Sequence, residues 1–94
     1  MLFNNLPLHD AVLIATHVSW EAARCDFRVL PVGGNPHWLV FEGFTKIELP
    51  RNEPWGPSNS INGVRQLEPT SFEIELQSGD VLQINATHWS YREE

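Results

Sequence analysis

The residues best suited by type to do chemistry are an adjacent His9-Asp10 pair and two serines in a proline-rich segment near the middle of the chain. A histidine oriented by a carboxylate can act as a general base, and a nearby serine hydroxyl would then be the nucleophile of a hydrolase. The nucleophile elbow of such enzymes reads Gly-x-Ser-x-Gly, but Gly56-Pro57-Ser58-Asn59-Ser60 lacks the second glycine. Pro57 also removes a backbone N–H that could have stabilised an oxyanion. We therefore expect both serines to cap turns.

The other histidines, His17, His37 and His88, fall on different expected strands and show no close ligand spacing. Histidines scattered over a β domain usually form hydrogen bonds at the sheet surface. We expect no metal site and no cofactor. A small hydrolase or metal-dependent enzyme that uses His9, Asp10, His88 and the loop serines remains the alternative to a binding function.

The segment from Pro50 to Gly63 is the strongest candidate for a working surface. Its three prolines fix φ and remove backbone donors, so the segment is expected to be a stiff loop and not part of a helix or central strand. Trp55 is a large apolar ring at its centre, and we expect it to pack the loop onto the sheet. The expected binding residues are those of the loop and of the His9-Asp10 turn, namely Trp55, Ser58, Asn59, Ser60, Asn62, His9 and Asp10.

Four tryptophans are many for 94 residues. At least two should fill the core, because each can bury about 150–250 Å². Trp20 lies on the more apolar face of its expected strand and is expected to be buried. Trp38 lies on the same face as Glu42 and is expected to be exposed. Exposed tryptophans beside acidic and amide groups would also suit a carbohydrate-binding domain, which is a second alternative.

Length and charge restrict the class of protein. Ninety-four residues allow one domain, covering 1–94, and a net charge of −6 argues against a nucleic-acid partner. No apolar run approaches the about 18 residues of a membrane helix, so no membrane partner is expected. Cys25 is the only cysteine, which excludes an intrachain disulfide, and we expect a cytoplasmic location.

Alternating side chains predict strands. Every second residue from Val12 to Trp20 forms the more apolar face of one expected strand. In the next expected strand, from Ala23 to Val29, apolar and charged side chains alternate, and Pro31 ends it. Further strands are expected over 37–49, with a break or bulge at Gly43, and over 72–77 and 81–89, while 64–70 reads as irregular. The expected fold is all-β, a single small antiparallel sandwich or curled sheet of about five strands with meander-like connections.

Three short motifs carry a resemblance. Leu8-His9-Asp10-Ala11, Pro54-Trp55-Gly56-Pro57-Ser58 and Gln77-Ser78-Gly79-Asp80 resemble those of a small uncharacterised bacterial all-β family, which implies no assigned activity. The opening His-Asp-Ala is similar to that of immunity-type proteins of toxin systems, which implies a cytoplasmic protein that binds another protein. His9-Asp10 is also similar to the ligand pair of HD-type phosphohydrolases, but those enzymes are helical and need further ligands.

The sequence thus favours a non-enzymatic protein-binding module that acts through the Pro50 to Gly63 loop. The partner is expected to be another protein or a second copy of the chain, because edge strands of a small open sheet invite pairing.

Overall fold

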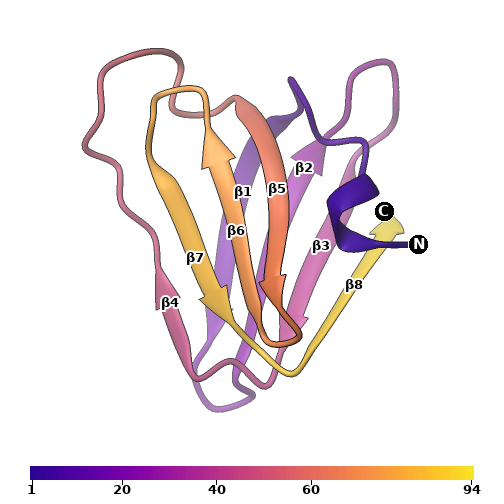
Figure 1. Cartoon of the computed structure of the whole chain (residues 1–94). Coiled ribbons are helices and arrows are strands. Elements are labelled where there is room, and N and C mark those ends of the chain that lie inside the picture. Colours follow the sequence, from indigo (N-terminus) through magenta and orange to yellow (C-terminus); the bar gives the residue numbers. More distant parts are fainter.

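The strands form two four-stranded antiparallel sheets in the computed structural model, which describes residues 1–94 (Figure 1). Sheet A has the spatial order β1 (Val12–Ser19), β2 (Arg24–Leu30), β3 (His37–Glu42) and β8 (His88–Glu93). Sheet B has the order β4 (Lys46–Glu48), β7 (Val81–Asn85), β6 (Ser71–Leu76) and β5 (Ile61–Glu68). The expected all-β antiparallel sandwich is confirmed, with eight strands in place of about five.

The core lies between the two sheets and follows from the period of two. Cys25, Phe27 and Val29 of β2 are fully buried, while their neighbours along the strand are partly exposed. β6 and β7 alternate in the same way. The short 3-10 helix η1 (Phe3–Asn5) adds Phe3, whose ring contacts Phe41 of sheet A and Phe72 of sheet B. One continuous cluster of 16 buried residues results.

The chain crosses between the two sheets at two adjacent places. The chain leaves sheet A after β3 and enters sheet B as β4, and it returns from β7 to sheet A as β8 (Figure 1). The crossings lie against each other, because the Thr87 amide donates to the Glu42 carbonyl at 3.0 Å and the Thr45 amide donates to the Asn85 carbonyl at 2.9 Å. Gly43 turns the first crossing with a φ of 67°. The expected strands over 37–49 and 81–89 are therefore each divided into two.

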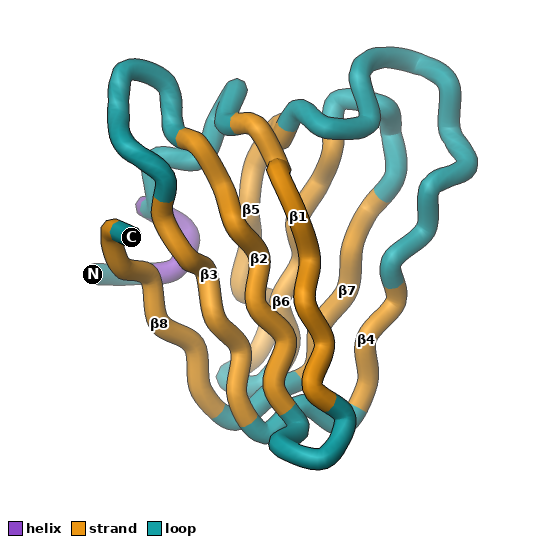
Figure 2. Tube along the Cα trace, turned by 180° about the vertical axis from the view of Figure 1, so that it is seen from behind, coloured by secondary structure: helices purple, strands orange, loops and turns teal.

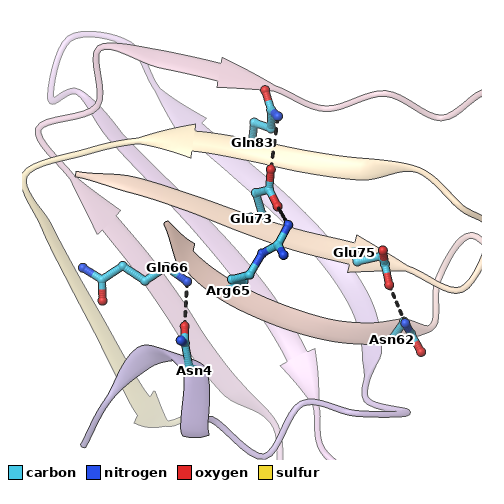
Figure 3. Close-up of polar contacts among 7 residues, drawn as sticks. All are labelled: Asn4, Asn62, Arg65, Gln66, Glu73, Glu75 and Gln83. Carbon is cyan, nitrogen blue, oxygen red and sulfur yellow. Dashed lines mark hydrogen bonds and ion pairs between the residues drawn. The ribbon is translucent and has the colours of Figure 1, made fainter. Parts of the chain in front are cut away.

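The prediction of irregular structure over 64–70 was wrong, as was the extension of the loop to Gly63. β5 begins at Ile61 and pairs with β6 through two register shifts. Figure 3 shows its polar outer face, where Arg65 donates to Glu73 at 2.7 Å. The two irregularities and Gly63 interrupt the alternation that marks a strand, which is why sequence patterning missed it.

The predicted inner face of β1 was right for Thr16 and Val18 but wrong before the middle of the strand, where Leu13 and not Val12 or Ile14 faces inward. A register shift between Leu13 and Ala15 places a bulge at Ile14, so the parity changes within the strand. Leu13, Thr16 and Val18 lie opposite the buried residues of β2 and therefore share the inner face. Ile14 and Val18 are 42% and 44% exposed instead of buried.

Cys25 is predicted to be chemically inert in the folded protein. Its side chain is fully buried, and burial followed by the nearby Asp26 charge raises the pKa of the thiol to about 11. Since the thiolate is the reactive form, a disulfide reagent at pH 8 should modify Cys25 at least about 100-fold more slowly than in denaturant. Equal rates with and without denaturant would contradict the buried position.

No helix of the structure has the length and apolarity needed to cross a membrane.

Candidate functional site

The loop between β4 and β5 is held in one shape by a buried carboxylate. Asp80, 4% exposed, follows β6 in the turn to β7. Its oxygens accept hydrogen bonds from the backbone amides of Asn52 and Glu53 at 3.1 Å and from the Ser78 hydroxyl at 3.0 Å. Burial favours the neutral acid, but these donors and the positive charge of Arg51 outweigh it and lower the pKa of Asp80 below its ordinary value. The carboxylate is therefore the anchor of the loop.

Trp55 stands at the outer end of the anchored loop. Trp55 is 80% exposed, so the prediction that its side chain packs the loop onto the sheet was wrong. The backbone provides the attachment instead, since the Trp55 amide donates to the Ser78 carbonyl at 3.2 Å. Indole Nε1 donates to a Glu53 carboxylate oxygen at 3.1 Å, and the ring lies so close to Gly79 that a Cβ there would come within 2.6 Å of its Cδ1. The ring is held while its surface stays open to solvent.

The end of the loop joins both sheets. The Leu13 amide donates to the Asn59 carbonyl at 2.7 Å, and the Gln77 amide donates to the Ser60 carbonyl at 2.7 Å. Ser60 also forms an isolated bridge with Val12. Ser58 and Asn59 line a groove beside β1. The loop residues thus contribute mainly backbone contacts, and the sheets on either side are tied together at this end of the molecule.

The His9-Asp10 turn reaches the same region. His9 Nδ1 lies 2.7 Å from the Asn62 carbonyl oxygen, and Gln77 Nε2 donates to Asp10. His9 Nε2 lies 3.5 Å from Asp10, and both side chains are largely exposed. Asn62 Nδ2 donates in turn to Glu75 (Figure 3). We call the assembly of this turn, the loop and the β6–β7 turn the loop surface, comprising His9, Asp10, Arg51–Ser60, Asn62 and Gln77–Asp80.

The residues of the alternative enzyme do not assemble. His88 begins β8 opposite Glu42, at the end of sheet A where β1 finishes, whereas His9 precedes the start of β1 (Figure 1). Ser58 and Ser60 have no histidine among their hydrogen-bond partners. His17 and Trp38 pack with their rings nearly perpendicular, and His37 stacks on Tyr91. No three histidine, cysteine or acidic side chains gather as metal ligands.

The tryptophans separate into two kinds. Trp89 packs on Phe3 and the core, and Trp38 is half-buried, so the expectation that Trp38 is the exposed one was wrong. Trp20 is 81% exposed against the expected burial, and it lies in the β1–β2 turn at the opposite end from Trp55. A single binding face built from exposed tryptophans is therefore absent.

Sequence analysis did not predict two features of this region. Sequence analysis missed the anchoring role of Asp80, because the pattern Ser78-Gly79-Asp80 predicted only a turn. A groove of about 330 Å³ between β1 and the two ends of the loop, lined by 11 residues, was also unforeseen. The one signal for the groove is that β1 lacks charged residues and prolines.

Comparison with protein-family models, curated proteins and solved structures found no match to this chain. The resemblances carried by the short motifs therefore stay predictions. Function is argued below from the geometry of the loop surface.

Proposed function

We propose that this protein is a non-enzymatic protein-binding module, similar in role to an immunity protein, whose working surface is the loop surface around Trp55. The observation that carries the proposal is an indole 80% exposed on a loop whose backbone is fixed by a buried carboxylate. Tryptophan is enriched among the residues that dominate binding energy at protein interfaces. A side chain already held in place loses little further freedom on binding, so the contact costs less entropy.

The charge of the loop surface favours a basic partner. Glu53 presents an exposed carboxylate beside Trp55, and Asp10 presents another elsewhere on the loop surface, against the single guanidinium of Arg51. The whole chain carries a net charge of −6, which would attract a basic protein from a distance and raise its association rate. The setting that we propose is the cytoplasm, where the lone buried thiol stays reduced.

The test compares two equally exposed tryptophans at opposite ends of the molecule. Trp55→Ala should weaken capture of a basic protein from an extract of the source cells by about 30-fold, the effect of losing about 2 kcal/mol at an interface hot spot. Trp20→Ala is the matched control, because Trp20 is 81% exposed but distant from the loop, and it should bind like the wild type. Rising salt should weaken capture by wild type.

A partner that binds wild type and Trp55→Ala equally well would refute the proposal. So would a partner lost on replacement of Trp20 instead. Circular dichroism of both variants checks that each keeps the wild-type fold.

A further inference from the structure

Three of the four sheet edges are protected against pairing with another chain, and β1 is not. β4 is three residues long and contains Lys46 and Glu48. β5 has two register shifts, and its Gln66 amide donates to the side chain of Asn4 in η1 (Figure 3). β8 ends in charged residues. Short length, charge, irregular register and covering elements are the usual means of blocking edge pairing.

β1 has none of these protections beyond its single bulge. Its eight residues contain no lysine, arginine, acid or proline. Only its start is covered, by the Leu13 bond to Asn59 and the bridge of Val12 to Ser60, so the edge from Ile14 to Ser19 has no strand beside it. Unpaired backbone groups on such an edge are a template for an added strand.

A groove runs along the free edge. Leu13 to Thr16 form one wall, Leu49 to Arg51 form the other, and Leu76 and Leu82 lie among the apolar lining residues. Figure 2 shows β4 and the loop that follows it diverging from β1, with the widest separation toward the end where the loop lies. The volume of about 330 Å³ suits a short extended segment with apolar side chains.

From these observations we infer that the β1 groove binds one extended segment of a protein partner, which adds to sheet A as a strand beside β1. The segment is uncharged along the ladder, presents β-branched or aromatic side chains to the groove, and carries an acidic residue at the end next to Arg51. Arg51 is the only charged residue that lines the groove, so the charge complement is a carboxylate. This inference rests on the proposed protein-binding function. The groove shares Arg51, Ser58 and Asn59 with the loop surface, but Trp55 does not line it.

A second copy of this chain fits the edge less well than a single segment. Antiparallel pairing of two β1 strands about a two-fold axis keeps both sheets B on the same side of the joined sheet. β4 and its loop project past β1 on that side, as Figure 2 shows, so the two copies would compete for the same space. A segment one strand wide avoids this conflict.

The experiment selects random peptides displayed on phage against the immobilised wild-type protein. Enriched peptides should alternate β-branched or aromatic residues with small polar ones and carry an acid at one end. Synthetic versions should bind Thr16→Lys at least about tenfold more weakly than wild type, because the lysine places a charge on the groove wall. Ser90→Lys adds the same charge to the exposed surface of the opposite edge strand of sheet A, and it should bind like wild type.

Two further readouts identify the mode of binding. Bound peptide should slow hydrogen exchange of backbone amides in Ile14–Ser19, as added ladder hydrogen bonds require. Arg51→Glu should shift selection from peptides with a terminal acid to peptides with a terminal lysine or arginine. Trp55→Ala should leave peptide affinity unchanged, so loss of the Trp55 contact and loss of the groove contact are separable.

Absence of enriched peptides, or equal binding of wild type and Thr16→Lys, would overturn the inference. A wild-type dimer at micromolar concentration that Thr16→Lys dissociates would also overturn it, by assigning the edge to a second copy. Equal slowing of exchange in all strands would indicate general stabilisation instead of strand addition.

Discussion

Replacing Gly43 with alanine is expected to lower the free energy of unfolding by about 2–3 kcal/mol. Gly43 has a φ of 67°, a conformation that costs an L-residue about 1–2 kcal/mol. An added Cβ would also lie 2.3 Å from Thr87 Oγ1, which donates to the Glu42 carbonyl at 3.1 Å. Relief of the overlap requires Thr87 to move, at the expense of that hydrogen bond. Urea denaturation monitored by circular dichroism measures the change.

Gly63→Ala is the matched control for this prediction. Gly63 lies in β5, has no unusual φ, and has open space where a Cβ would be placed. Its replacement should change stability by less than about 1 kcal/mol, in either direction. Combining Gly43→Ala with Thr87→Ala separates the two causes, because the backbone cost remains when the Thr87 hydroxyl is absent. Equal effects of the two glycine variants would mean that the crossings between sheets are not packed as described.

Asp80→Asn is expected to lower the melting temperature at pH 7 by roughly 5–10 °C and to loosen the loop. The substituted amide keeps the shape of the side chain but has one oxygen in place of two to accept from Asn52, Glu53 and Ser78. Amide exchange of Asn52, Glu53 and Trp55 should accelerate. An unchanged loop in this variant would show that Asp80 is not the anchor.

The pH dependence of stability gives the same prediction an independent test. Because the folded pKa of Asp80 is lowered, its contribution is present above the ordinary aspartate pKa of about 3.9 and is lost as pH falls through the lower folded value. Wild type should therefore lose stability over this acid range, and Asp80→Asn should lose less. Asp26→Asn is the control, since Asp26 pairs with a partly exposed Arg24 at 2.8 Å and such pairs contribute little.

These two sites connect the fold to the proposed function. The crossings near Gly43 close one end of the sandwich, and Asp80 fixes the loop at the other (Figure 1). A variant that destabilises the crossing should unfold the domain as a whole, whereas the loss of Asp80 should first affect the surface around Trp55. Comparison of Gly43→Ala with Asp80→Asn in the partner-binding assay would thus distinguish global instability from local disorder of the loop.

The sequence by itself determined the all-β class, the antiparallel pairing of β1 with β2, and the position of the stiff loop. Each of these depends on local properties: the alternation of Cys25, Phe27 and Val29 against polar neighbours, and the fixed φ of the prolines. The alternation of side chains gave wrong predictions where a bulge or a register shift interrupts the strand. The bulge at Ile14 changed which residues face inward at the start of β1, and the register shifts of β5 concealed a whole strand.

Only the tertiary structure decided what the loop does. The contact of Asp80 with Asn52 joins positions 28 residues apart, and that of Gln77 with Asp10 joins positions 67 apart. Whether a carboxylate in a turn faces solvent or accepts distant amides depends on which segment the sheets bring beside it. The exchange of β4 and β8 between sheets brings these segments together and leaves β1 without a neighbour, and no property of the individual residues reveals this arrangement.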